Sequence, residues 1–189
     1  MRKLKLQVQM TVDGFIARKN GEMDWMINNW DDGLNAYVKE LTEPVDCIIL
    51  GRKLAEGFIP YWASNPEGED VSGIEKINNT PKIVFTKTLE KSVWENTVLA
   101  KGDLTEEITK LKKQEGHDII VYGGATFVSD LIKHNLIDEY YLFINPTAIG
   151  KGMTIFNNIE ETLLLTHVKS SSFDCGIVVL RYVSKDFKK

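Results

Sequence analysis

Short apolar runs alternate with helical patterns along most of this 189-residue chain. Between Leu4 and Met10 every second residue is apolar, which is the period-two pattern of a half-buried strand. Within residues 34–41 the apolar positions follow i, i+3, i+4 and i+7, which indicates a helix packed on a core. The next run, DCIILG at 46–51, is continuous and predicts a strand covered on both faces. The alternation therefore predicts a sheet layered with helices.

The same alternation continues towards the C-terminus. We expect strands at 82–86, within 92–100, at 118–122 and at 138–149, and helices starting at 52, spanning 104–116 with Thr105 as the cap, and spanning 125–135. Residues 59–80 are rich in Pro, Gly, Asn and Ser, which predicts a long irregular loop with one helical turn at 74–77. Two apolar runs joined through residues 174–176 indicate an antiparallel hairpin. Residues 1–189 are thus predicted to form one α/β domain with a mixed, mostly parallel sheet.

Composition limits the kinds of partner that such a domain is expected to bind. The formal net charge of -4 and the pI near 5.5 give no basic footprint for nucleic acid, and no apolar run approaches the length of a membrane span. Cys47 and Cys175 stand far apart, without a CxxC pair or clustered histidines, so neither a disulfide framework nor a metal site is indicated. We therefore expect a cytoplasmic protein whose partners are small molecules.

The residues that follow the predicted strands carry the functional signal, because open α/β sheets bind ligands beyond the carboxyl ends of their strands. Gly123 and Gly124 separate the strand at 118–122 from a helix that begins with Ala125 and Thr126. Glycines there let a ligand approach the backbone, and the amides of a helix start favour phosphate. A tight turn without a ligand explains the pair equally well. The segment lacks the third glycine of GxGxxG and the lysine of a Walker loop.

Two more strand ends carry cations. Gly51, Arg52 and Lys53 open a predicted helix, where positive charges oppose the macrodipole at a cost of about 0.3–1 kcal/mol each. A bound anion would make this placement favourable, whereas solvated side chains turned outward would need no ligand. Thr86 and Lys87 follow the strand at 82–86. Together the three strand ends would suit a ligand with several phosphates, such as a dinucleotide that carries an extra phosphate.

These segments also carry a family resemblance that runs nearly from end to end. The chain resembles the dihydrofolate-reductase-like superfamily, and more closely the riboflavin-biosynthesis reductase domain (the RibD C-terminal domain family) and its stand-alone relatives. The resemblance rests on TVDGFIA at 11–17, GEMDW at 21–25, ILGRKLAEGF at 49–58, IVFTKTL at 83–89, VYGGATFVSDLI at 121–132, IDEYYLFINP at 137–146 and GKGMTIF at 150–156.

The resemblance implies a three-layer fold, with a mixed sheet of about eight strands and helices on both faces, that uses NADPH as a hydride donor. It implies a pyrophosphate turn formed by Gly123, Gly124, Ala125 and Thr126. It also implies a 2'-phosphate pocket formed by Gly51, Arg52, Lys53, Thr86 and Lys87. These are the three strand ends that the residues themselves point to.

Hydride transfer needs a group that neutralises the partner atom, and two carboxylates are candidates. Asp13 lies in the TVDG turn after the first strand, where riboflavin-type relatives bring substrate and nicotinamide together, although Asp-Gly is also an ordinary turn pair. Asp32 lies near the position at which dihydrofolate reductases carry a single acid, although Asp31 or Asp32 could equally be a helix cap. We rank Asp13 first.

Aromatic residues are candidates for the substrate side. The resemblance places Trp25 beside a substrate loop, although packing in the core would also explain it. Tyr61 and Trp62 could stack on a flat heterocycle, or cover an apolar surface or a dimer contact.

The sequence thus predicts an NADPH-dependent reductase of a small pyrimidine, pterin or flavin-like heterocycle, similar to 5-amino-6-(5-phosphoribosylamino)uracil reductase. The alternatives are an NADPH-binding module with little catalysis, or dihydrofolate reductase activity. The sequence has no arginine between Arg52 and Arg181 to bind a folate carboxylate, which disfavours folate. The zinc ligands of an attached deaminase are also missing. A homodimer is possible, with the apolar run at 177–180 as one candidate contact and interior sheet as its other explanation.

Overall fold

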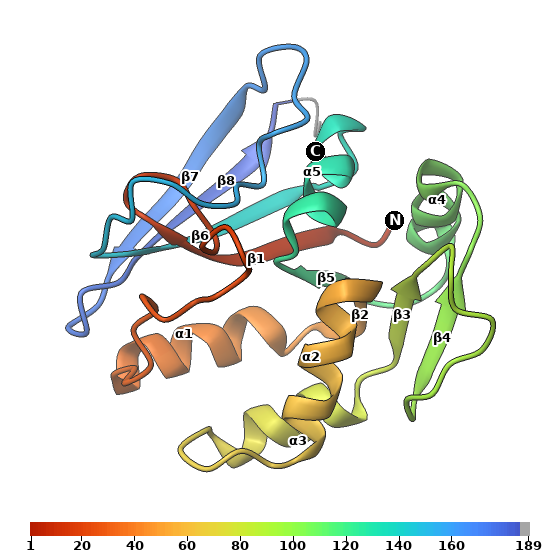
Figure 1. Cartoon of the computed structure of the whole chain (residues 1–189), viewed down its shortest axis with the longest axis horizontal. Coiled ribbons are helices and arrows are strands. Elements are labelled where there is room, and N and C mark those ends of the chain that lie inside the picture. Colours follow the sequence, from red (N-terminus) through yellow and green to blue (C-terminus); the bar gives the residue numbers. More distant parts are fainter. Residues whose placement is uncertain (186–189) are drawn as a thin grey trace.

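The computed structural model describes residues 1–185, which form one eight-stranded sheet in the order β4-β3-β2-β5-β1-β6-β8-β7 (Figure 1). The first six strands in this order pair in parallel, and β6-β8 and β8-β7 are antiparallel. The predicted mixed, mostly parallel sheet that ends in an antiparallel hairpin is confirmed. The strands are β1 (Leu4–Thr11), β2 (Val45–Gly51), β3 (Lys82–Phe85), β4 (Thr97–Ala100), β5 (Asp118–Tyr122), β6 (Glu139–Asn145), β7 (Leu165–Ser172) and β8 (Val178–Ser184).

Helices cover both faces of this sheet, as Figure 1 shows. The helices α1 (Asp32–Thr42), α2 (Arg52–Ala63) and α3 (Val71–Asn79) lie on one face, with α1 over β6 and β8, and α2 and α3 over β2 and β3. The helices α4 (Leu104–Lys113) and α5 (Ala125–Lys133) pack with β1, β2 and β5 in the largest core cluster, on the other face. The sheet is therefore the middle of three layers.

The central strand β1 is covered on both faces, which differs from the half-buried strand that its alternation predicts. The apolar residues of the pattern, Leu4 to Met10, join the core beneath α4 and α5. The polar residues between them face α1 and α2, yet Lys5 and Gln7 are only 6% and 8% exposed. Two helices on the polar face account for this burial. We call Lys5, Gln7 and Gln9 the polar strip of β1.

Residues 59–80 form two helical segments, so the prediction of a long irregular loop is wrong. Helix α2 continues through Pro60 to Ala63, and α3 follows after a short connection. Pro60 is exposed and lies in the third turn, where its fixed φ is compatible with a helix although it donates no hydrogen bond. The carboxylate of Asp70 accepts a hydrogen bond from the Gly73 amide at 2.8 Å and caps α3.

Some element boundaries also differ from the prediction. Asp103, not Thr105, caps α4, because its carboxylate accepts hydrogen bonds from the amides of Thr105 and Glu106 at 2.9 and 3.1 Å. The helix ends at Lys113 instead of residue 116. Strand β6 ends at Asn145 because Pro146 follows and cannot donate to a ladder.

The apolar run at 177–180 belongs to the interior of the sheet. Ile177 and Val179 are 0% and 1% exposed and pack against α1, so they offer no surface for a dimer contact. Among residues 1–185, the helices are all too short or too polar to cross a bilayer.

Candidate cofactor and substrate site

The carboxyl ends of β1, β2, β3 and β5 meet at one edge of the sheet, because these strands are parallel. Strand β5 ends at Tyr122, level with Gln7, whereas β1 continues for four more residues to Thr11. The chain then leaves β5 for α5 on one face, whereas β1 and β2 lead to α1 and α2 on the other. Neighbouring strands whose connections go to opposite faces form the crevice in which α/β proteins bind ligands.

The turn after β5 requires its two glycines for backbone conformation. Gly123 and Gly124 have φ values of 41° and 88°, a region that side chains disfavour. A Cβ on Gly123 would meet no atom within 4 Å, so the space beside this residue is open. Helix α5 has no side-chain cap at its start, because its N-cap is Gly124. The first amides of α5, at Ala125 and Thr126, are therefore suited to an anion.

The start of α2 combines packing with charge. A Cβ on Gly51 would lie 2.8 Å from the Cβ of Phe127, so the glycine lets the end of β2 approach α5. The guanidinium of Arg52 pairs with the Glu56 carboxylate at 2.6 Å, one turn along the helix, and the ammonium of Lys53 is exposed. The first turn of α2 contains no acidic residue. Two cations therefore stand at a helix start that has no side-chain cap.

At the end of β3, Thr86 has a structural role. It is 7% exposed, and its hydroxyl oxygen accepts hydrogen bonds from the amides of Thr88 and Leu89, both at 3.1 Å. These bonds form the turn and occupy the acceptor capacity of the hydroxyl. The side chain of Lys87 is exposed beside this turn and carries the charge of this strand end.

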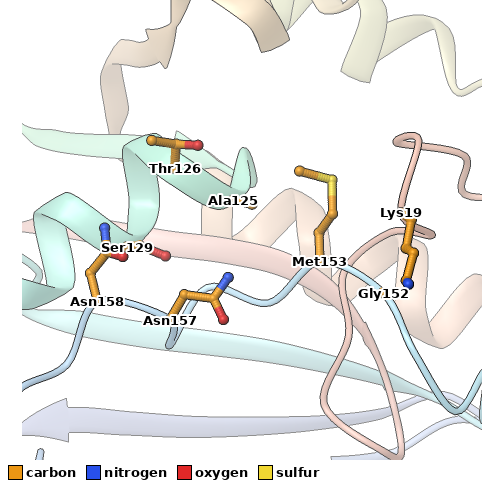
Figure 2. Close-up of a pocket in the computed structure, with 8 residues that line it drawn as sticks. All are labelled: Lys19, Ala125, Thr126, Ser129, Gly152, Met153, Asn157 and Asn158. Atoms are coloured by element: carbon orange, nitrogen blue, oxygen red, sulfur yellow. The ribbon is translucent and has the colours of Figure 1, made fainter.

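A cavity of about 260 Å³ adjoins the start of α5. Figure 2 shows Thr126 and Lys19 on opposite sides of it, with Met153 between them. The sequence pointed to Ala125 and Thr126 but not to Lys19 or the asparagines, because single residues of two loops form no spacing motif. The lining residues are Lys19, Ala125, Thr126, Ser129, Gly152, Met153, Asn157 and Asn158.

Asp13 holds the loop after β6. Its carboxylate accepts hydrogen bonds from the Thr11 hydroxyl at 2.5 Å and from the amides of Gly150 and Ile149 at 2.6 and 3.1 Å. The Thr11 hydroxyl, followed by the two amides, lowers the pKa of Asp13, although desolvation opposes them. A carboxylate held in this way accepts hydrogen bonds and is poorly suited to donate a proton. Asp13 lies in the turn after β1, and its hydrogen bonds fix the loop at residues 149–150.

The carboxylates at the start of α1 are not buried acids. Asp31 is the N-cap, and its oxygens accept hydrogen bonds from the amides of Leu34 and Cys175, both at 2.8 Å. The Cys175 amide, followed by that of Leu34, lowers the pKa of Asp31. Asp32 is exposed in the first helical turn. The helix-cap explanation therefore applies to Asp31, and Asp32 has no burial that would make it an acid in a pocket.

Trp25 and Trp62 lie in different parts of the molecule. Trp25 is 7% exposed, and its indole nitrogen has no hydrogen-bond partner within residues 1–185. The segment after it is fixed by Asn145, whose side-chain oxygen accepts a hydrogen bond from the Ile27 amide at 2.9 Å. Trp62 is in the last turn of α2, about 15 Å along the helix from Arg52 at 1.5 Å per residue. The structure therefore does not bring Trp62 to the edge, because the predicted loop around it is helical.

Within residues 1–185, His, Cys, Asp and Glu side chains form no group of three that could hold a metal ion. Both cysteines are free thiols, and burial raises the pKa of Cys47 to about 11. The candidate site is thus built from glycine amides, from cations and from the carboxylate of Asp13, which fixes the loop at residues 149–150.

A central parallel sheet closed by an antiparallel pair, with a glycine turn at the carboxyl end of β5, defines a dihydrofolate-reductase-like α/β fold. The structure superposes on Enterococcus faecalis dihydrofolate reductase with a TM-score of 0.64 at 19% identity, covering 97% of each chain. Within this class, the chain belongs to the RibD C-terminal domain family, whose model matches residues 2–179.

Two further relatives span nearly the whole chain. The uncharacterised protein YyaP of Bacillus subtilis (strain 168) is 31% identical over 182 residues, which are 96% of this chain and 94% of YyaP. The crystal structure of a Shewanella sp. PV-4 protein described as belonging to riboflavin biosynthesis has a TM-score of 0.74 at 23% identity. That alignment covers 98% of this chain and 99% of the Shewanella chain. The fold is thus one that dihydrofolate reductase also has.

Proposed function

We propose that this protein is an NADPH-dependent reductase that transfers a hydride to a small pyrimidine, pterin or flavin-like heterocycle. The observation that carries the proposal is the meeting of the Gly123–Gly124 turn, the uncapped start of α5 and the cations of α2 at one sheet edge. Such contacts suit a dinucleotide with an extra phosphate, because backbone amides bind its pyrophosphate and cations bind its third phosphate.

Each group at the edge has a distinct part in this proposal. The amides of Gly124, Ala125 and Thr126 would bind the pyrophosphate, and Arg52, Lys53 and Lys87 would bind the 2'-phosphate. Lys19 lines the cavity beside α5 and adds a fourth cation. When bound, NADPH would supply the hydride.

The proton that accompanies the hydride needs another source than Asp13. Its lowered pKa and its contacts with the 149–150 amides support a role in positioning the loop. Because the carboxylates of Asp31 and Asp32 are also not buried, we propose that solvent water delivers the proton. The rate of such a step would depend on the order of the loop rather than on the ionisation of a side chain.

A second candidate function is an NADPH-binding module with little catalysis. The observation that favours it is the same lack of a buried acid among Asp13, Asp31 and Asp32. The two candidates share every cofactor contact and differ only in turnover. Dihydrofolate reductase activity is a weaker alternative, because no arginine lies between Arg52 and Arg181. We also propose a cytoplasmic location and a homodimer. Size-exclusion chromatography with light scattering would test the homodimer.

Thermal unfolding with NADPH, with NADH and without either tests the cofactor. A ligand at about 100 times its dissociation constant stabilises a protein by roughly 2.7 kcal/mol, on the order of 5–10 °C for a domain of this size. We expect this shift with NADPH and a smaller one with NADH. No shift with NADPH would overturn the proposal, and equal shifts would remove the role of Arg52 and Lys53.

The variant Arg52→Ala sharpens the test. Loss of a charge-assisted contact should weaken NADPH by roughly 1.5–3 kcal/mol and leave NADH nearly unchanged. Lys113→Ala, which removes an exposed cation from the last turn of α4, is the matched control and should change neither affinity. NADPH oxidation with dihydropterins, flavins and aminopyrimidine ribosides then separates the enzyme from the binding module.

A further inference from the structure

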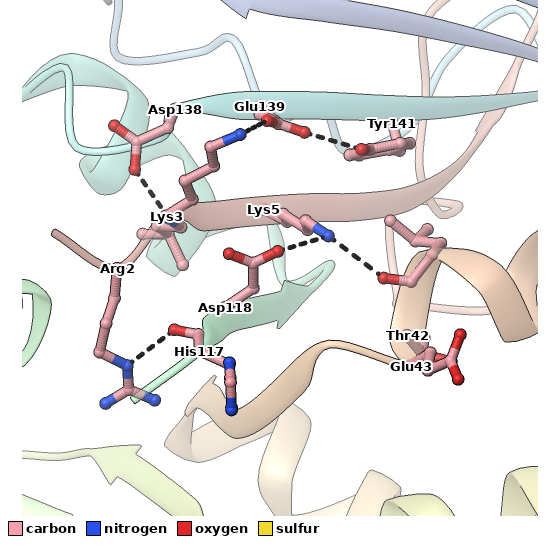
Figure 3. A network of polar contacts seen from close by, with 12 residues as sticks. Arg2, Lys3, Lys5, Thr42, Glu43, His117, Asp118, Asp138, Glu139 and Tyr141 are labelled. Carbon is pink, nitrogen blue, oxygen red and sulfur yellow. Dashed lines mark hydrogen bonds and ion pairs between the residues drawn. The ribbon is translucent and has the colours of Figure 1, made fainter. Parts of the chain in front are cut away.

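Lys19 lines the cavity beside α5, and its ammonium has no hydrogen-bond or ion-pair partner within residues 1–185. By contrast, Lys5 of the polar strip of β1 pairs with the Asp118 carboxylate, and Lys3 pairs with the Glu139 carboxylate, both at 2.7 Å (Figure 3). None of the described residues that line the cavity is acidic. The lining therefore leaves the positive charge of Lys19 without a counter-charge.

Two loops that meet beside the cavity hold Lys19 in place. The Ala17 carbonyl, two residues before Lys19, accepts a hydrogen bond from the Met153 amide at 2.8 Å. A Cβ on Gly152 would clash with the same carbonyl oxygen, so this glycine allows the two loops to approach each other. The position of Lys19 at the cavity thus follows from the backbone, although its side chain is exposed.

The order of the strands gives the direction in which the proposed cofactor would lie. Its pyrophosphate would bind at the turn after β5, and the cations proposed for its 2'-phosphate follow β2 and β3, on one side of β5. Strands β1 and β6 lie on the other side, and the chain that follows them carries Lys19 and Met153. The nicotinamide half, which is joined to the pyrophosphate opposite the adenosine, would therefore point to the cavity of about 260 Å³.

The two redox forms of the cofactor differ in charge at this end. The nicotinamide ring is positively charged in NADP⁺ and neutral in NADPH, whereas the phosphates of the two forms are the same. Charges repel within a Debye length, about 8 Å at physiological ionic strength, so a lysine at the same cavity disfavours the oxidised ring. Asn158, which donates to the Asp130 carboxylate at 2.9 Å, lies across the cavity from Lys19 (Figure 2), so this acid does not pair with the ammonium.

We propose that Lys19 is a specificity-determining residue that makes the site bind NADPH more tightly than NADP⁺. The inference rests on the proposed function, because it takes the dinucleotide to bind at this edge of the sheet. It adds the direction of the cofactor and a residue that distinguishes the reduced from the oxidised form. Such a preference would favour entry of the hydride donor and release of the spent cofactor.

The test is the ratio of the Kd of NADP⁺ to the Kd of NADPH, measured by isothermal titration of the full chain. Attraction between Lys19 and the phosphates affects both constants equally and cancels in the ratio. We expect a wild-type ratio of at least about three, and Lys19→Gln should lower it about threefold, as for two unit charges about 6 Å apart in water. Lys19→Glu should lower the ratio further. Salt at about 1 M should bring the wild-type ratio close to that of Lys19→Gln.

Adenosine 2',5'-bisphosphate, which lacks the nicotinamide half, tests the direction of the cofactor. Its Kd should rise in Arg52→Ala and stay unchanged in Lys19→Gln. The matched control is Lys113→Gln, the same change at an exposed cation in the last turn of α4, which should keep the wild-type ratio.

Three results would overturn the inference and leave the proposed cofactor in place. They are an unchanged ratio in Lys19→Gln, a wild-type ratio of one or less, and a bisphosphate Kd that rises threefold or more in Lys19→Gln. Failure of the wild-type protein to bind NADPH would instead overturn the proposed function and the inference with it. Because the Lys19 side chain is exposed, we expect its variants to fold with the wild-type Tm.

Discussion

The carboxylate of Asp13 accepts a hydrogen bond from the Gly150 amide at 2.6 Å, although the two residues are 137 positions apart in the sequence. The bond joins the turn after β1 to the loop after β6. Ile16 and Met153 reinforce the same junction, because the Ile16 amide donates to the Met153 carbonyl at 2.8 Å. The two loops at the candidate site therefore form one structural unit.

Replacement of Asp13 by Asn tests the positioning role. We expect NADPH oxidation to slow because the amide accepts the two backbone hydrogen bonds more weakly than the carboxylate. We also expect the variant to keep the wild-type shape of the pH-rate profile between pH 5 and pH 9. A profile that loses a limb in Asp13→Asn would instead identify Asp13 as a proton donor.

The lowered pKa of Asp13 also predicts a pH dependence of stability. A carboxyl group with a depressed folded-state pKa contributes stability above its unfolded pKa of about 3.9, and this contribution is lost as the pH falls through the folded-state value. Wild-type protein should therefore exceed Asp13→Asn in Tm at pH 7, and the difference should shrink below about pH 4. A constant difference in Tm from pH 7 to pH 3 would contradict the assignment.

Glu56→Gln should strengthen the binding of NADPH. The ion pair with Glu56 competes with any phosphate for Arg52, and both side chains are partly exposed at 32% and 46%. Such pairs contribute roughly 0.2–1 kcal/mol, so the Kd for NADPH should fall by a factor of about 1.5–5 while that for NADH stays constant. Fluorescence titration measures both constants. Glu106→Gln, on the exposed side of α4, is the control and should change neither constant.

Two glycines of the β2-α2 segment should respond in opposite directions to alanine. At Gly51 a Cβ would lie 2.8 Å from Phe127, so Gly51→Ala should destabilise the fold by about 1–3 kcal/mol through overpacking. At Gly57, inside α2, a Cβ would meet nothing within 4 Å, so Gly57→Ala should stabilise by about 0.5–1 kcal/mol. Urea unfolding measures both values. A Gly51→Ala variant that loses no stability would show that the contact with Phe127 does not explain this glycine.

Asn145 should be intolerant of aspartate. The residue is fully buried, accepts a hydrogen bond from the Ile27 amide and donates one to the side-chain oxygen of Gln9. In Asn145→Asp a carboxylate oxygen would face the Gln9 oxygen, so two acceptors would meet without a donor. We expect a loss of about 1–3 kcal/mol at pH 7. The loss should decrease towards pH 4, because the protonated acid can donate again. Asn29→Asp, at an exposed position before α1, should show no such pH dependence in urea unfolding.

The strand-helix alternation was sufficient to predict the class of fold, because apolar periodicity depends on the layers that bury it. It failed at residues 59–80, where the tertiary contacts of α2 and α3 override a composition typical of loops. It pointed correctly to the glycine turn after β5, since a positive φ restricts the residue type. The alternation could not show that Gly51 has to be a glycine, because that requirement comes from a contact with the distant Phe127.

The other residues of the candidate site are brought together by long-range contacts, which no spacing of residues in the sequence predicts. The bonds of Asp13 to Ile149 and Gly150 require the folded chain, as does the cavity beside Lys19. The polarity of Gln7 and Gln9 was visible in the sequence, where alternation indicated a solvated face. Only the structure places two helices over that face and leaves the Oε1 of Gln7 buried without a partner among residues 1–185.

The two faces of strand β1 contact different layers of the fold. Its even-numbered residues from Leu4 to Met10 fill the core beneath α4 and α5, while Gln7 and Gln9 face the other layer. Mutations at Gln7 can therefore change the contacts with α1 and α2 while the packing of that core stays intact. A library randomised at residue 7 alone would therefore sample the layer of α1 and α2 without disturbing the core beneath α4 and α5.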